Sequence, residues 1–340
     1  MYELIAKNKR KSVIVFLAMG LILLILGAGL GFWFDINSGY GGYNTIIGPY
    51  TIIGMLIALV LWAVQAWIAY KKGAQVVLSG MDAKELTKEE DPMMYNIIEE
   101  LTMASGLPMP KIYLINTPAM NAFAAGSKPE NSVVAITAGL RNTLNRHEIQ
   151  GVMAHEMSHI YNRDVMYMTF AGVMMCTIVM LSQVLTRMVF YGRMGGRNRS
   201  SSGGNNGLIY LIFIAVVVIL ALLGGTVAQL FYFSLSRKRE YLADTMAVKF
   251  TQDPSALADA LQKISGDTEV FNPGTTAAAM CINKPKIKEH VTNLYSTHPP
   301  IQKRIAILRA MSEGTTYENY CKANQTIMGK NDLPKFKTEA

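Results

Sequence analysis

Two long uncharged segments near the start of the chain most restrict what it can fold into. Residues 13–34 form a run of 22 residues without a charge, and residues 51–70 form another of 20. A helix needs about 20 such residues to cross the roughly 30 Å of hydrocarbon in a bilayer. Across all 340 residues, 51% are hydrophobic and only 16% are charged, unlike the average soluble protein. The sequence therefore predicts a multi-pass α-helical membrane protein.

Basic residues flank these two segments at their outer ends only. A basic cluster within residues 7–11 precedes the first segment and Lys71 and Lys72 follow the second, whereas residues 35–50 contain no Lys or Arg. Because loops rich in Lys and Arg stay in the cytoplasm, both basic ends are expected there, together with the chain that follows Lys72. The first segment is longer than the apolar part of a signal peptide and has no clear cleavage site, so it is interpreted as an uncleaved anchor.

Two further apolar segments, residues 165–186 and 208–235, occur later in the chain. The loop between them holds four arginines and no acidic residue, although a helix leaving the cytoplasm would place this loop outside. This pair is therefore expected either to span the membrane against the charge rule or to form a membrane-embedded hairpin.

Residues 82–164 carry a globular pattern. A helix that begins after Asn142 or Asn145 and ends near Tyr161 is expected at its end. Three short strand-like segments separated by turn residues precede this helix: residues 111–115, 120–124 and 132–137. Strands followed by a helix predict an α+β domain.

This expected helix carries the sequence HEMSH at residues 155–159. Residues four apart lie on one face of a helix, which brings His155 and His159 within reach of one tetrahedral Zn²⁺. Glu156 adjoins the first histidine, where its carboxylate can take a proton from a water molecule that attacks a carbonyl group. Such a motif arises by chance in roughly one in a few hundred chains of this kind. The alternative is a pair of histidines that merely pack or cap.

A catalytic zinc site needs a third protein ligand and an open position for water. The fourth apolar segment ends in SRKREYLAD, where Glu240 and Asp244 are four residues apart on one helical face. Glu240 could complete a His₂Glu site, and Asp244 could hydrogen-bond the outer nitrogen of a ligand histidine. Taken alone, an acidic pair is more typical of a solvated helix. Beside an HExxH motif, Glu240 is the best candidate, with His298 or Asp244 as the alternatives.

The order of these features resembles one known family. Two apolar helices, HEMSH followed by NRD, an apolar hairpin, SRKREYLAD and STHPPIQKRIAIL look like the HtpX-type membrane zinc metalloproteases, relatives of the Ste24-type CAAX proteases in peptidase family M48. The resemblance covers nearly the whole chain. It implies that His155, His159 and Glu240 bind one Zn²⁺ per chain. It also implies that Glu156 is the general base and that Asp244 supports a ligand.

Two further assignments follow from the resemblance. His298 and Arg304 match the family's His-Pro motif with an arginine six residues after the histidine, which implies that His298 helps to stabilise a developing oxyanion. The residues before the prolines could instead, or in addition, cap a helix. The segment NAFA is similar to the family's strand beside the cleft, which would hold an extended peptide by backbone pairing; the alternative is a buried core strand. This segment consists of Asn121, Ala122, Phe123 and Ala124.

We therefore expect a polytopic α-helical membrane protein with a zincin-like α+β cytoplasmic metalloprotease domain. Residues 1–70 form the first transmembrane pair and residues 71–164 the first part of the protease domain. Residues 165–235 form the second transmembrane or membrane-embedded hairpin. Residues 236–340 form the second part of the protease domain, with the third zinc ligand and a cytoplasmic C-terminus.

The expected function is that of a zinc-dependent endopeptidase in a bacterial-type plasma membrane, with its active site facing the cytoplasm. Misfolded or damaged membrane proteins and unfolded polypeptides are the expected substrates. The net charge of +8 fits contact with anionic lipid, and no nucleic-acid module is apparent. Two alternatives stay open: a site-2-type intramembrane protease, and a metal-stabilised scaffold or transport protein that would not need Glu156. The sequence specifies no oligomeric state.

Overall fold

The computed structural model of the chain describes residues 2–38, 47–79, 81–192, 237–267 and 300–311, and positions 215, 318, 319, 322, 323 and 325. The chain divides into two compact units. Unit 1 comprises Met1–Ser12, Ala69–Gly172 and Tyr232–Ala340, and unit 2 comprises Val13–Ile68 and Val173–Phe231. His298 and, apart from position 215, the expected apolar segment 208–235 lie outside the described residues.

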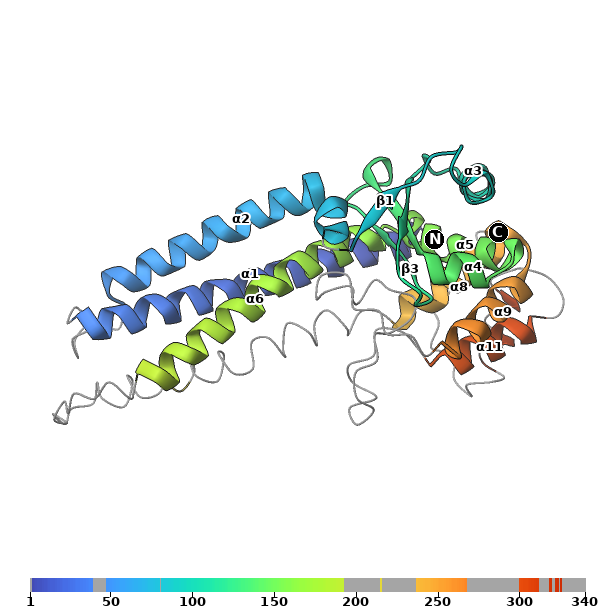
Figure 1. Cartoon of the computed structure of the whole chain (residues 1–340). Helices are drawn as coiled ribbons and strands as arrows, with labels where there is room; N and C mark the ends of the chain where they lie inside the picture. The colour runs from blue at the N-terminus through green and yellow to red at the C-terminus, as the bar shows by residue number, and fades with distance from the viewer. Residues whose placement is uncertain are drawn as a thin grey trace. The chain divides into compact units, whose positions relative to one another are not determined.

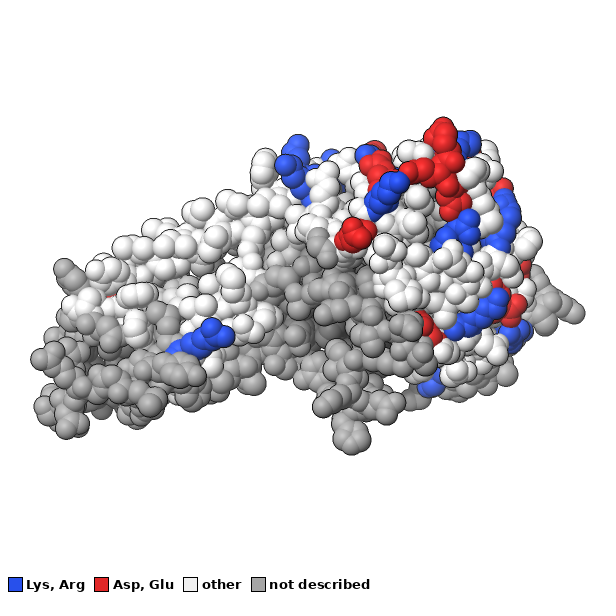
Figure 2. All heavy atoms as spheres, in the orientation of Figure 1, with Lys and Arg blue, Asp and Glu red and all other residues white. Residues whose placement is uncertain are grey.

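Three helices in the described part of the chain are long and apolar enough to cross a membrane: α1 (Tyr2–Ser38), α2 (Pro49–Leu78) and α6 (Asp164–Gly192). On α2, Leu56, Ile57 and Val60 are 55%, 55% and 60% exposed. Large apolar side chains exposed along a helix of this length are stable in contact with lipid. On the face drawn in Figure 2, charged side chains gather over β1 and α3, whereas α1 and α2 show almost none.

Close backbone contact joins α1 to α2 within unit 2. A Cβ atom on Gly27 would lie only 2.5 Å from the carbonyl oxygen of Gly54, so larger residues would force the helices apart. Asp35 is buried and accepts hydrogen bonds from the backbone N–H groups of Tyr50 (3.0 Å) and Thr51 (2.8 Å). This carboxylate therefore caps the N-terminus of α2.

Unit 1 contains a four-stranded sheet in the order β1-β2-β4-β3. Its strands are β1 (Ala83–Glu85), β2 (Lys111–Ile115), β3 (Ala122–Ala125) and β4 (Val133–Thr137). β2 and β4 are parallel, while β1 and β3 run antiparallel to their neighbours. The three expected strands are present, with ends displaced by at most two residues. β1 was not expected, because three residues are too few to show an alternating pattern.

The central helix of unit 1 is α5 (Arg146–Tyr161), which begins and ends where the sequence predicts. Asn145 accepts a hydrogen bond from the N–H of Glu148, and the Glu148 carboxylate accepts one from the N–H of Asn145, which forms a capping box. Every residue from 151 to 160 is buried. A helix buried on all sides lies inside a domain rather than on its surface.

The remaining helices of unit 1 cover the sheet and α5. They are α3 (Pro92–Ser105), η1 (Pro129–Asn131), α4 (Ala138–Thr143), α8 (Arg237–Thr251), α9 (Pro254–Ser265) and α11 (Ile301–Ala310). Both α8 and α9 pack against α5, and α11 packs against α9 (Figure 1). A Cβ on Gly151 would lie 2.8 Å from the Leu257 nitrogen, so this glycine permits the close approach of α5 and α9. The sequence analysis did not anticipate α9.

Candidate metal centre

His155, Glu156 and His159 lie in the C-terminal half of α5. The two histidines are buried, and their ring centroids are 4.9 Å apart with nearly perpendicular planes. This separation follows from their spacing of four residues on one helical face. Glu156 is also buried, with 2% of its surface exposed. The helix thus presents two imidazoles and one carboxylate inside unit 1.

A third donor comes from α8. The Glu240 carboxylate places Oε2 3.4 Å from Nε2 of His155 and Oε1 3.5 Å from Nε2 of His159. Two ligand atoms that each lie about 2.0–2.2 Å from one tetrahedral zinc ion are about 3.3–3.5 Å apart. The donor atoms of these three buried side chains lie within 4.8 Å of one another. They are therefore positioned to bind a metal ion.

Asp244 and Arg304 hold the far side of His155. Oδ1 of Asp244 lies 2.9 Å from Nδ1 of His155. Arg304, on α11, donates to both oxygens of Asp244, from Nε at 2.9 Å and from a terminal nitrogen at 2.6 Å. Burial raises the pKa of Asp244, but the Arg304 charge and the contact with His155 outweigh burial and hold this pKa below its ordinary value. An ionised carboxylate at Nδ1 leaves Nε2 of His155 directed at Glu240.

The same contacts control the charge of His155. Burial and the Arg304 charge lower the pKa of His155, but hydrogen bonds to Asp244 and Glu240 outweigh them and raise this pKa to about 9. A metal ion needs the neutral imidazole, so a proton competes with the metal for this ring.

A second carboxylate faces the other histidine. Asp164, the first residue of α6, places Oδ2 3.6 Å from Nδ1 of His159 and Oδ1 3.5 Å from Nε of Arg239. Arg239 is buried, and its guanidinium carbon lies 4.6 Å from the centre of the Tyr167 ring. The arrangement repeats, with longer distances, the carboxylate-arginine pair behind His155.

Neither Asp164 nor Arg239 stood out in the sequence as a site residue. Asp164 follows His159 by five residues, which is not the spacing of one helical face. Arg239 is the last of three consecutive basic residues, a pattern typical of a solvated segment. The turn between α5 and α6, where Arg163 has φ of 61°, brings the Asp164 carboxylate to His159. The tripeptide NRD was the one sequence signal for this contact.

The expected substrate strand lies beside the metal-binding helix. Ala122, Phe123 and Ala124 belong to β3, Asn121 precedes it, and all four side chains are buried. β3 packs against α5 and pairs with β4 alone among the described strands. The Thr137 N–H donates to the Asn121 oxygen at 3.0 Å. Because antiparallel partners alternate, the backbone polar groups of Ala122 and Ala124 face away from β4.

The His-Pro motif is only partly visible, since His298 lies outside the described residues. Arg304 from the same motif is fully buried, and one of its terminal nitrogens lies 3.7 Å from Oε2 of Glu240. The motif therefore reaches the metal centre through its arginine.

Comparisons with known proteins identify the family of the chain. The model of the family described as Peptidase family M48 matches residues 88–312, a range that includes all three donors. The chain belongs to peptidase family M48. Two relatives of this M48 chain bear the name Protease HtpX homolog. The protein from Listeria innocua is 41% identical over 316 residues, and that from Streptococcus uberis is 37% identical over 312; each comparison covers 92% of this chain and 100% of the relative.

Among solved structures, the M48 chain is similar to the crystal structure of Ste24p from S. mikatae, with a TM-score of 0.46 and 18% sequence identity. That comparison covers 91% of this chain and 67% of the other. The family and its curated relatives confirm the expected resemblance, and the protein is a metalloprotease. Together with its candidate spans, they identify this M48 protein as a membrane protein.

Proposed function

We propose that this M48 protein is a zinc-dependent endopeptidase that cleaves misfolded or damaged membrane proteins. The observation that carries the proposal is the convergence of His155, His159 and Glu240 beside a buried Glu156. Two imidazoles and one carboxylate are the protein ligands of one class of catalytic zinc sites, in which water takes the fourth position.

The roles proposed for these side chains follow from their chemistry. Zinc, when bound, acts as a Lewis acid that polarises a carbonyl group and makes water a stronger nucleophile. Glu156 accepts the proton of the attacking water and can return it to the leaving amine. His298 contributes a hydrogen bond to the oxyanion that develops on the scissile carbonyl. The burial of Glu156 strengthens its electrostatic interactions, because the interior screens charges less than water does.

Asp244 and Asp164 orient the two histidines in this proposal. Each carboxylate faces the Nδ1 atom of one histidine, which leaves Nε2 of both rings beside Glu240. A carboxylate within hydrogen-bond distance of the outer nitrogen, as Asp244 is for His155, fixes the tautomer of the ring and makes it a more basic ligand; Asp164, at 3.6 Å, would act on His159 mainly through its charge. Arg304 balances the charge of Asp244.

The proposed substrate is an extended peptide that pairs with β3. The backbone groups of Ala124 that face away from β4 are of the kind that strand addition uses, whereas the Ala122 N–H already donates to Asn121 Oδ1 at 3.0 Å. The four buried side chains of residues 121–124 would keep this edge rigid. Such pairing recognises the backbone of a substrate more than its sequence, which suits an enzyme that acts on unfolded segments.

We further propose that residues 71–164 and 236–340 form the protease domain on the cytoplasmic face of the plasma membrane, with residues 1–70 and 165–235 as the membrane-embedded parts. The uncharged run of α2 ends in Lys71 and Lys72, and basic ends of spans stay in the cytoplasm. In the described residues, α5 is not a candidate span. This favours a site next to the membrane over the site-2 type of protease.

A proteolysis assay on the purified protein in detergent tests the function. We expect the protein to degrade casein, to lose this activity when a chelator removes the metal, and to regain it when zinc is added back. A metal-stabilised scaffold would bind zinc without cleaving casein under any of these conditions.

The cytoplasmic orientation predicts that an epitope tag placed after Ala340 is protected in right-side-out spheroplasts. The positive charges that flank the first two spans are the physical reason. Protease added outside should leave the tag intact and should remove it only after the membrane is opened. Digestion of the tag in intact spheroplasts would show that the C-terminus lies outside, opposite to the proposed orientation.

A further inference from the structure

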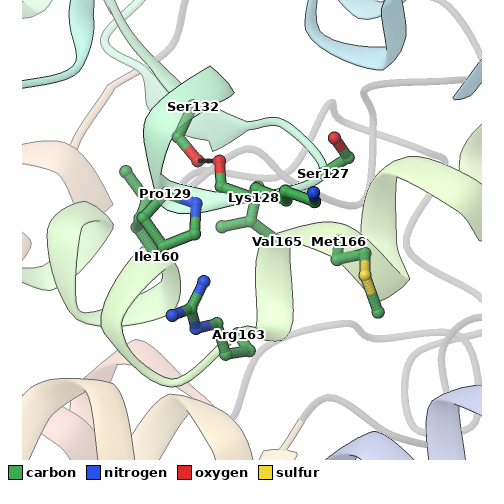
Figure 3. Close-up of a pocket in the computed structure, with 8 residues that line it drawn as sticks. All are labelled: Ser127, Lys128, Pro129, Ser132, Ile160, Arg163, Val165 and Met166. Carbon is green, nitrogen blue, oxygen red and sulfur yellow. Dashed lines mark hydrogen bonds between the residues drawn. The ribbon is translucent and has the colours of Figure 1, made fainter. Parts of the chain in front are cut away.

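A pocket of about 320 Å³ lies between the loop that follows β3 and the junction of α5 with α6 (Figure 3). Small-molecule sites begin at roughly this volume. Lys128 and Arg163 line the pocket and are positively charged, while Val165 and Met166 contribute apolar surface from the first turn of α6. The described residues of its lining include neither an acidic residue nor a donor of the metal centre. We propose that this pocket binds the phosphate group of an anionic glycerophospholipid.

The pocket lies where two apolar helices begin and end. The candidate span of α6 begins at Asp164, directly after Arg163, and the uncharged run of α2 ends at Tyr70. Lys128 Nζ lies 5.0 Å from the centre of the Tyr70 ring, and Ser127 donates a hydrogen bond to the Tyr70 carbonyl oxygen at 2.6 Å. Tyrosine and basic residues gather at the boundary between hydrocarbon and water, where lipid phosphates lie.

Hydrogen bonds hold the wall of the pocket in place. The N–H of Gly126 donates to Oγ1 of Thr169 on α6 at 3.1 Å, and the Ser132 hydroxyl donates to the Lys128 carbonyl oxygen at 2.6 Å. The loop is therefore attached to α2 through Ser127 and to α6 through Gly126. These bonds fix the start of the loop at two adjacent residues, and the Ser132 bond closes the loop on itself, which reduces the entropy lost when a ligand binds.

Arg163 supplies a positive charge that no described residue compensates. Its guanidinium has no hydrogen bond or ion pair with any residue that the structure describes. Figure 3 shows its side chain pointing into the space bordered by Pro129, Ile160 and Val165. Its φ of 61° is uncommon for a residue other than glycine, and such conformations are concentrated at functional sites.

The combination of charge and apolar surface selects the ligand. A phosphate group accepts hydrogen bonds from a guanidinium in a bidentate geometry, and a second cation strengthens the attraction. Val165 and Met166 offer an apolar surface on which acyl chains can continue along α6 into the bilayer. An acidic side chain of a peptide substrate could pair with the two cations, but it would leave the apolar surface of Val165 and Met166 without a contact.

Lipid binding to the full-length protein tests the proposal independently of peptidase activity. The protein would carry Glu156→Gln to prevent self-cleavage and would be titrated in detergent with dioctanoyl phosphatidylglycerol, dioctanoyl phosphatidylcholine or glycerol phosphate, with native mass spectrometry as the readout. We expect phosphatidylglycerol to bind more tightly than phosphatidylcholine. Arg163→Asn should weaken phosphatidylglycerol binding about fivefold, and adding Lys128→Gln should weaken it by about the same factor again.

The substitutions at position 163 are chosen to suit its backbone conformation, and a control lies outside the pocket. Asn tolerates the left-handed conformation of position 163, so Arg163→Asn removes the charge and keeps the turn. Arg163→Lys keeps the charge and should retain most of the binding. Lys249→Gln removes an exposed lysine on α8 that does not line the pocket and should leave binding unchanged.

Three results would overturn the proposal. The first is equal phosphatidylglycerol affinity in the Arg163→Asn and parent proteins. The second is competition by glycerol phosphate as strong as that by the lipid, which would indicate a site for free phosphate. The third is unchanged lipid binding together with weaker cleavage of acidic peptides when Arg163→Asn is placed in the wild-type enzyme, which would assign the pocket to the substrate.

Discussion

Replacing Glu156 with glutamine is expected to lower peptidase activity at least about a hundredfold, since a general base contributes roughly 10² to 10⁴. Glutamine keeps the size of the side chain but cannot accept a proton at neutral pH. Glu156 is not among the three donors that converge on the metal position, so bound metal should stay at the wild-type level. Casein cleavage and metal content per chain, measured on the same preparation, check both halves of this expectation.

The control is the same substitution at an exposed position. Glu89→Gln, in the turn before α3, should leave both activity and metal content unchanged. Equal turnover by wild type and Glu156→Gln would contradict the proposed role of Glu156. Loss of metal together with activity in Glu156→Gln would instead place this carboxylate among the ligands.

Replacing Glu240 with alanine is expected to lower metal affinity and peptidase activity together. The Glu240 carboxylate lies 3.4 Å and 3.5 Å from the Nε2 atoms of the two histidines, so its removal leaves two protein donors among the described residues. Removing a residue that hydrogen-bonds a metal ligand typically weakens metal binding about 10- to 100-fold. Removing Glu240, a ligand itself, should weaken metal binding by more than this. Metal affinity measured by competition with a chelator of known affinity, in detergent, checks this value.

Asp164→Asn provides a graded comparison in the same assay. It keeps the size of the side chain that faces Nδ1 of His159 but removes the charge, and it should weaken metal binding about 10- to 100-fold. Glu240→Ala should therefore be the weaker binder of the two. Wild-type affinity in Glu240→Ala would show that another residue is the third ligand, with Asp244 and His298 the first to test.

Local sequence patterns were sufficient for several elements of this protein, although not for β1 or α9. The lengths of residues 13–34 and 51–70 predicted the membrane helices, since crossing hydrocarbon requires a minimum number of apolar residues. The sequence placed the start of α5 after Asn142 or Asn145, and Asn145 is its N-cap in the structure. Placing His155 and His159 on one face needed only the geometry of a single helix. All of these properties depend on residues that are close together along the chain.

The third donor could be proposed from the sequence but not located by it. Glu240 lies 81 residues after His159, and no local rule specifies the distance between two helices so far apart in sequence. An acidic pair in EYLAD is also common on solvated helices. The packing of α8 against α5 brings the carboxylate to the histidines and buries it.

The sequence by itself determined that the chain enters the membrane and carries two histidines and a glutamate on one helix, because hydropathy and helical periodicity are local properties. Only the tertiary structure decided that Arg304 lies behind Asp244, that Asp164 faces His159, and that β3, beside α5, pairs with β4 alone among the described strands. These contacts join segments that follow different helices and strands. Their distances result from packing the whole domain at once, so no window of the sequence contains them.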